Sequence, residues 1–270
     1  MTPHRVSIRA TGFREPGSKV KAPVAGERGR ADAFAAAAHP PRPVAGAVFF
    51  DLDRTLISRP TPLALSATFR RGGFVRKRDL VRIALWQLVF ALPGVDGTRR
   101  ASVEGMSLLR GLPVATLQEL IGNAMEAVLR PLLFTDSLDL LARHRARGER
   151  AYIVSASLYE IVAHVAADLG FDGAIGSTCE IVDGVYTGRS LTACYGPHKA
   201  DAVRDLATRE GIDLALSTGY SDSSSDLEFL EIVGHPVVIN PDRRLRRIAA
   251  ARGWPILQFR NLVQPRPSGA

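Results

Sequence analysis

Several features that mark large classes of protein are scarce in this chain of 270 residues. It holds two cysteines, Cys179 and Cys194, without the spacing of a metal site, so we expect free thiols. The longest apolar segment, residues 83–92, is too short to span a bilayer. The N-terminal segment lacks the apolar core of a secretory signal. These absences predict a cytoplasmic protein that does not insert stably into a membrane.

Acidic residues are scarce near the N-terminus. Residues 1–44 hold eight basic and three acidic side chains and show no periodic apolar face. Such a segment cannot bury enough apolar surface to fold, and we predict a disordered basic tail over residues 1–44. The tail carries five of the eight excess positive charges of the chain. The remaining residues are therefore not basic enough to predict a nucleic-acid partner.

The most informative segment is residues 48–56, with the sequence VFFDLDRTL. Its apolar run predicts a buried strand, and Asp51 and Asp53 follow at a spacing that places both side chains on one side. Two carboxylates so close repel each other unless a cation lies between them, and hard oxygen ligands suit Mg²⁺. An aspartate whose charge a metal offsets can attack a phosphoryl group. The alternative is a strand that ends in an ordinary acidic turn.

Two further segments place polar side chains at the ends of predicted elements. Residues 151–157 predict a second apolar strand that ends in hydroxyls and is followed by a helix. At a helix N-terminus Ser155 can hold a phosphate oxygen, whereas Ser157 is more typical of an N-cap. A Gly-Pro pair opens another predicted helix, which carries Lys199. A single lysine on a helix is usually a solvated surface group, so Lys199 alone indicates little.

A third strand is predicted over residues 214–220, and the loop after it is rich in serine. This loop places Asp222 just beyond the strand and Asp226 four residues later. Taken alone, the loop is typical of an acidic, serine-rich helix cap. Residues 180–187 contain an Asp-Gly pair between apolar positions, which predicts a β-hairpin without a chemical role.

In order and spacing, these four segments resemble the motifs of the haloacid dehalogenase superfamily, whose phosphatases use an aspartate nucleophile. The motifs correspond to Asp-x-Asp-x-Thr at residues 51–55, Ser155 at a strand end, Lys199 at a helix start, and Asp-x-x-x-Asp at residues 222–226. The resemblance covers residues 45–260. It implies an α/β fold, with a Rossmann-like parallel sheet and helices on both faces.

The resemblance also implies a role for the first motif. Asp51 would be the nucleophile, and Asp53 would be the general acid and base. The implied cofactor is Mg²⁺, held by Asp51, by Asp222 and by the backbone carbonyl of Asp53.

The remaining motif residues would act on the phosphate or support the site. Ser155 and Lys199 would bind phosphate oxygens, while Thr55 and Asp226 would support the residues around them. The implied partner is a small phosphorylated substrate, hydrolysed through an aspartyl-phosphate.

The spacing between the first two motifs indicates a branch of the superfamily. It is far longer than one strand-to-strand connection needs, and it contains helical patterns near residues 62–70, 79–92, 99–110 and 116–130. Residues 116–119 also match a capping box. The insertion resembles the helical cap of the phosphoserine-phosphatase-like branch, subfamily IB. We therefore predict an α/β core over residues 45–59 and 135–262, a small α-helical cap over 60–134 and a short tail over 263–270.

One position departs from the phosphoserine phosphatase pattern, in which a glutamate shortly after the first motif pairs with the substrate ammonium. The matching segment here is Ser58-Arg59-Pro60, and no acid follows before Asp79. An unpaired ammonium in a closed pocket would be costly, so strict specificity for phosphoserine is not expected. Arg54 and Arg59 favour instead a substrate with a second anionic group, although Arg59 is equally compatible with exposure to solvent.

Two other functions stay open at this level. A lipid-phosphate phosphatase, of the phosphatidylglycerophosphate type, would use residues 83–92 and the basic cluster before them for peripheral membrane contact. A buried cap helix is the ordinary interpretation of the same residues. The third hypothesis is a regulatory protein that binds a partner on the same fold, and the intact pair Asp51 and Asp53 argues against it.

Overall fold

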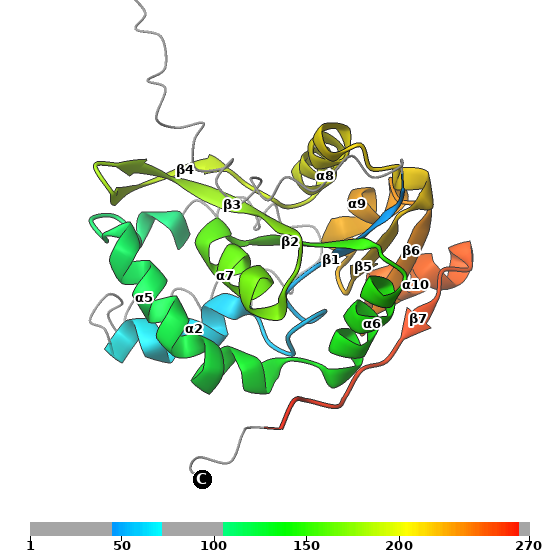
Figure 1. Cartoon of the computed structure of the whole chain (residues 1–270), viewed down its shortest axis with the longest axis horizontal. Coiled ribbons are helices and arrows are strands. Elements are labelled where there is room, and N and C mark those ends of the chain that lie inside the picture. Colours follow the sequence, from blue (N-terminus) through cyan, green and yellow to red (C-terminus); the bar gives the residue numbers. More distant parts are fainter. Residues whose placement is uncertain (1–44, 72–104, 265–270) are drawn as a thin grey trace, which may run out of the picture. The chain divides into compact units, whose positions relative to one another are not determined.

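A seven-stranded sheet runs through the part of the chain that the structure describes, residues 45–71 and 105–264 in this computed structural model (Figure 1). In spatial order its strands are β4 (Val185–Thr192), β3 (Gly173–Val182), β2 (Arg150–Leu158), β1 (Ala47–Phe50), β5 (Thr218–Ser221), β6 (His235–Ile239) and β7 (Ile256–Leu257). Neighbouring strands of this sheet are parallel except β3 and β4, which are antiparallel. The predicted tail of residues 1–44 and the predicted helix at 79–92 lie outside the described residues.

Alternate residues of β1 face opposite sides of the sheet, and helices cover both sides. Val48 and Phe50 belong to a cluster that includes residues of α6 (Thr135–Ala146) and α7 (Tyr159–Leu169). Ala47 and Phe49 belong to a second cluster, which includes residues of α8 (Pro197–Glu210), α9 (Leu227–Glu231) and α10 (Arg243–Arg252). All four side chains of β1 are buried, as expected for a parallel strand covered on both faces. The predicted α/β architecture is confirmed.

Helices also form within the predicted cap segment. α2 (Thr61–Arg71) confirms the helical pattern at residues 62–70. α5 (Val114–Ala124) continues into a π turn, Met125–Leu129, and a 3₁₀ turn, Arg130–Leu132. Of the predicted helix at 99–110, the described part is helical at residues 105–107. The cap boundaries, 60 and 134, stay a prediction.

The predicted capping box at residues 116–119 is wrong. α5 begins at Val114, so Thr116 lies inside its first turn. No side chain caps this end of the helix. The Val114 N–H donates instead to the Gly184 carbonyl at 2.9 Å. The Gly184 carbonyl therefore accepts a hydrogen bond from one of the free N–H groups at the start of α5, where a capping box would use side chains.

β3 and β4 form the predicted hairpin, and Asp183 and Gly184 take φ angles of 50° and 77° in its tight turn. β4 is also hydrogen-bonded to the segment before α5. The Gly111 N–H donates to the Tyr186 carbonyl at 2.9 Å, and the Tyr186 N–H donates to the Leu112 carbonyl at 3.0 Å. The hairpin thereby joins the predicted cap segment to the sheet.

The predicted third strand, residues 214–220, is shorter in the structure. Leu214–Leu216 form a 3₁₀ turn, and β5 starts at Thr218. The Asp213 carboxylate accepts a hydrogen bond from the Ala215 N–H at 2.8 Å, which stabilises the turn. Local capping therefore outweighs the strand propensity of the apolar residues.

Candidate active site

Three adjacent strands bring predicted site residues to one edge of the sheet. β2, β1 and β5 are neighbours and parallel, so their carboxyl ends lie together. Asp51 follows β1 directly, and its N–H donates to the Tyr220 carbonyl of β5 at 2.9 Å. Asp222 follows β5, and Ser155 lies near the end of β2. Ligand sites of open α/β sheets form at such an edge.

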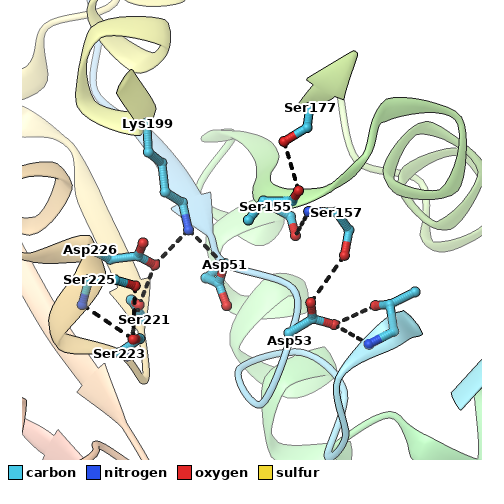
Figure 2. Close-up of polar contacts among 12 residues, drawn as sticks. Asp51, Asp53, Ser155, Ser157, Ser177, Lys199, Ser221, Ser223, Ser225 and Asp226 are labelled. Atoms are coloured by element: carbon cyan, nitrogen blue, oxygen red, sulfur yellow. Dashed lines mark hydrogen bonds and ion pairs between the residues drawn. The ribbon is translucent and has the colours of Figure 1, made fainter. Parts of the chain in front are cut away.

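Lys199 reaches this edge from the first turn of α8 (Figure 2). Gly196 precedes the helix with a φ of 54°, and Pro197 occupies the first helical position. The Lys199 side chain is 1% exposed, and its Nζ lies 2.6 Å from Asp51 Oδ1 and 2.6 Å from Asp226 Oδ2. A solvated surface position, the ordinary interpretation of a lone helical lysine, is therefore excluded.

Asp226 holds Lys199 from the loop after β5. It ends the 3₁₀ turn Ser224–Asp226, and its Oδ2 also accepts a hydrogen bond from the Ser221 hydroxyl at 2.7 Å. Burial works to lower the pKa of Lys199, but the carboxylates of Asp226 and Asp51 outweigh burial and raise the pKa. Lys199 thus stays charged between the two carboxylates.

The buried carboxylates of the site outnumber its one buried ammonium. Burial raises the pKa of Asp51 to about 7; Lys199 opposes the rise, and Asp226 adds to it. The pKa of Asp222 is also raised, by burial and by the charge of Asp51, and the charge of Arg54 opposes this rise. Ionising both Asp51 and Asp222 is therefore unfavourable in this site unless a cation offsets their negative charge.

The donors at this edge fit Mg²⁺, which takes a few oxygen ligands from a protein and retains water. Across residues 45–71 and 105–264, no three His, Cys, Asp or Glu side chains stand together as a complete ion site. The predicted ligand set is compatible with that result, because it needs two carboxylates, Asp51 and Asp222, and the backbone carbonyl of Asp53. Asp51 and Asp222 also lie close enough for their charges to repel, so a cation between them would be stabilised.

Asp53 lies on the side of Asp51 away from Lys199 (Figure 2) and accepts three hydrogen bonds. Its Oδ1 accepts from the Thr61 N–H at 2.7 Å and from the Thr61 hydroxyl. Its Oδ2 accepts from the Ser157 hydroxyl at 3.1 Å. Burial raises the pKa of Asp53, and the hydrogen bonds from Thr61 and Ser157 oppose this rise. The carboxyl group is thus held in one orientation beside Asp51.

Ser157 is not the N-cap that its position suggested. β2 extends to Leu158, and Leu158 is the residue that caps α7, without a side-chain hydrogen bond. β2 is irregular between Val154 and Leu158, but Ser155 and Ser157 are both buried while Ala156 between them is exposed, as in the alternation of a strand. This spacing, the same as that of Asp51 and Asp53, is the signal that indicates Ser157 as a site residue. No comparable pattern indicates Thr61.

Ser155 and Thr55 are both buried. The Ser155 Oγ accepts a hydrogen bond from the Ser157 N–H at 3.1 Å, which leaves the hydroxyl proton of Ser155 for a ligand. Among the described residues, the Thr55 hydroxyl has no hydrogen-bond partner, and the Thr55 carbonyl accepts from the Ser137 hydroxyl at 2.7 Å. The roles of Ser155 and Thr55 stay predictions.

Comparison with known proteins places this arrangement in a family. The sequence profile of the haloacid dehalogenase-like hydrolases matches residues 48–231. The chain belongs to this family. A probable phosphatase of Mycobacterium tuberculosis is 38% identical over 231 residues, which cover 83% of this chain and 80% of that protein. A phosphoserine phosphatase of the same species is 34% identical over 225 residues, 82% of this chain and 73% of that protein.

Solved structures of similar fold agree with this assignment to the haloacid dehalogenase-like hydrolases. A protein of unknown function from Bordetella pertussis Tohama I is 27% identical, with a TM-score of 0.72 over 79% of this chain and 98% of that one. A substrate-bound phosphoserine phosphatase has a TM-score of 0.60 at 18% identity, over 82% of this chain and 96% of that one, which shows the fold alone. The predicted family, with phosphoserine-phosphatase-like relatives, is confirmed.

Proposed function

We propose that this hydrolase is a phosphatase that cleaves a phosphomonoester through a phosphorylated Asp51. The observation that carries the proposal is the contact between Asp51 Oδ1 and the buried Nζ of Lys199, at 2.6 Å. A carboxylate in an ordinary acidic turn would lie in solvent without a buried cation. Asp51 is instead 6% exposed, at the sheet edge where ligands of this fold bind.

In the first step Asp51 attacks the phosphorus in line. A bond forms between its carboxylate oxygen and phosphorus while the bond to the leaving oxygen breaks, and Asp53 donates a proton to that oxygen. The leaving group departs as an alcohol. Lys199 and Ser155 hold the equatorial phosphate oxygens as negative charge builds up on them.

In the second step water attacks the phosphorus of the phosphorylated Asp51. Asp53, now a carboxylate, takes a proton from this water as its oxygen bonds to phosphorus and the bond between phosphorus and the Asp51 oxygen breaks. Phosphate is released, and both aspartates return to their starting states. Mg²⁺ held by Asp51, Asp222 and the Asp53 carbonyl would supply positive charge that lets a phosphate dianion approach the carboxylates. Asp226 keeps Lys199 in place through both steps, by its contact at 2.6 Å.

Relatives named as phosphatases support the activity and leave its substrate open. One of them is a phosphoserine phosphatase, yet residues 54–71 of this chain contain no acidic side chain that could pair with a substrate ammonium. We therefore propose a small phosphorylated metabolite as the substrate, with phosphoserine as one candidate among several.

No specific observation favours either of the other functions. Residues 83–92, which suggested membrane contact, lie outside the described residues. In the described ranges, no helix is long and apolar enough to cross a membrane. A protein that only binds a partner would not need a buried lysine held between Asp51 and Asp226.

The proposal is tested by a phosphatase screen of the full chain over amino-acid, sugar, nucleotide and lipid phosphates, with Mg²⁺ and with a chelator. We expect Mg²⁺-dependent phosphate release from at least one soluble phosphomonoester. Activity on lipid phosphates alone, dependent on detergent or liposomes, would support the lipid-phosphate alternative instead. A folded protein that releases phosphate from no substrate would support the regulatory alternative.

A further inference from the structure

We propose that Ser157 is a positioning residue for Asp53, and that its hydroxyl holds the carboxylate oxygen that exchanges a proton with the leaving group. The inference rests on the proposed function, in which Asp53 is the general acid. It adds to the site a residue that lies outside the four sequence motifs.

The two carboxylate oxygens of Asp53 are held unequally. Oδ1 accepts two hydrogen bonds from Thr61, one from its N–H at 2.7 Å and one from its hydroxyl. Thr61 is fully buried at the start of α2, so backbone and side chain together fix this oxygen. Oδ2 accepts one hydrogen bond, from the Ser157 hydroxyl at 3.1 Å. Oδ2 is therefore the oxygen that can exchange its partner while Thr61 keeps the carboxyl group oriented.

Ser157 itself is fixed at the end of β2. Its side chain is 7% exposed, and its N–H donates to the Ser155 Oγ at 3.1 Å. Ser157 does not cap α7, and its hydroxyl points toward Asp53 and donates to Oδ2 (Figure 2). One residue thus connects the predicted phosphate-binding serine with the predicted acid.

This connection predicts a particular effect on the reaction. A general acid must be aimed at the leaving oxygen, and a misplacement of about 1 Å can reduce the rate about 10²-fold. The Ser157 hydroxyl restricts rotation of the Asp53 carboxyl group and is released when Oδ2 turns to the leaving group with its proton. Loss of the hydroxyl should therefore slow the two steps in which Asp53 transfers a proton, the protonation of the leaving oxygen and the deprotonation of the attacking water.

Two substrates with different leaving groups test the inference. An alkyl phosphate needs a proton on its leaving oxygen, whereas p-nitrophenolate leaves p-nitrophenyl phosphate without one. The quantity to compare is kcat/KM, which reports the steps up to phosphorylation of Asp51. We expect Ser157→Ala to lower kcat/KM about 10-fold or more for the alkyl phosphate and less than about 3-fold for p-nitrophenyl phosphate, within the range of general acid catalysis. Ser157→Thr, which keeps a hydroxyl, should restore most of the lost activity.

Ser177→Ala is the matched control. Ser177 is a buried serine in the adjacent strand β3, and its hydroxyl donates to the Ala156 carbonyl at 2.7 Å. Its loss should reduce thermal stability and leave the ratio of the two kcat/KM values unchanged. If Ser157→Ala does not fold, Ser157→Cys, which keeps a side chain of similar size and a weak donor, carries the same expectation for the ratio.

Equal losses on both substrates in the Ser157 variants, or no loss on either, would overturn the positioning role. A wild-type protein that releases phosphate from neither of these two substrates, nor from any phosphomonoester of the screen described above, would show instead that the proposed function is wrong, and the role of Ser157 would fall with it. The wild-type measurement therefore separates the two failures.

Discussion

Lys199 and Asp51 are 148 residues apart in the chain, and the Lys199 Nζ lies 2.6 Å from the Asp51 Oδ1. The same ammonium contacts Asp226 at 2.6 Å. Because these side chains are buried, removal of the Lys199 ammonium would leave two carboxylates without a compensating charge. The position of the predicted nucleophile therefore depends on how α8 docks on the sheet.

Asp51→Asn should abolish turnover while the protein stays folded. The amide that replaces the carboxylate keeps an oxygen that can accept from Lys199, and Asp226 still pairs with the ammonium. An amide cannot form the phosphorylated intermediate, so kcat should fall at least about 10³-fold. Phosphate release and thermal melting measure the two effects.

Asp201→Asn is the control for this substitution, because Asp201 is an exposed aspartate of α8 whose partner is Arg204. Its activity should match that of the wild type. Near-normal hydrolysis by Asp51→Asn would exclude a phosphorylated Asp51.

Asp53→Asn should separate acid–base catalysis from metal binding. Loss of the proton donor should lower kcat/KM about 10²- to 10⁴-fold for an alkyl phosphate. The affinity for Mg²⁺, measured by calorimetry, should change little, because the proposed ligand at this residue is the backbone carbonyl. A large loss of affinity would show that the Asp53 carboxylate binds the ion itself.

The raised pKa values of two carboxylates predict how pH affects stability. In the metal-free protein the pKa of Asp51 is about 7, against an ordinary value of 3.8, and the pKa of Asp222 is also raised. A raised pKa means that the folded state favours the protonated form. Protonated Asp51 therefore adds to the free energy of unfolding. This gain is complete at a pH below the ordinary pKa of 3.8 and is lost as the pH rises through 7. Mg²⁺ binds the ionised carboxylates, so it should restore stability where this contribution is lost.

We expect the rise in melting temperature caused by Mg²⁺ to be at least about 3 °C larger near pH 7.5 than near pH 5.5, equivalent to about 1 kcal/mol for a chain of this size. Asp222→Asn should remove most of this difference. Burial lowers the pKa of His144, so its contribution to stability is complete above pH 6.5 and declines as the pH falls below that value, with or without Mg²⁺. A Mg²⁺ effect of equal size at both pH values would contradict the ligand set.

The site residues at strand ends could be predicted because their positions follow from the order of the strands and the alternation along each strand. Asp51, Ser155 and Asp222 meet because β2, β1 and β5 are adjacent. Lys199 carries a further signal, since it is the only lysine beyond residue 77 in a chain with 31 arginines. Its compact ammonium contacts two buried carboxylates, Asp51 and Asp226, at 2.6 Å each.

The contacts of Asp53 could not be predicted in the same way. Thr61 and Ser157 are 8 and 104 residues from Asp53 in the chain, and they approach it from different elements. The starts of α5 and β5 were predicted wrongly because the Gly184 carbonyl and the Asp213 carboxylate decide where these elements begin. Residue propensity does not include such partners.

The sequence does not favour phosphoserine as the substrate, although one relative is named a phosphoserine phosphatase. Residues 54–71 offer no carboxylate to a substrate ammonium. Arg54 is exposed, has a φ of 62°, and lies close enough to Asp222 to lower the pKa of that carboxyl group. A guanidinium at this place favours a second anionic group on the substrate, through charge-assisted hydrogen bonds. We therefore expect phosphoserine to be no better a substrate than phospholactate or phosphoglycerate, by kcat/KM.

A preference for phosphoserine above about 30-fold, or about 2 kcal/mol, would show that an acid outside residues 54–71 pairs with the ammonium. Arg54→Gln should lower kcat/KM for phosphoglycerate about 10-fold, the scale of one charge-assisted hydrogen bond. Arg59→Gln is the control, because Arg59 is also exposed and no described contact connects it with the site. Both substitutions remove one positive charge near the first motif, so general attraction of anions would weaken equally in both. A loss confined to Arg54→Gln would therefore report a direct contact with the second anionic group.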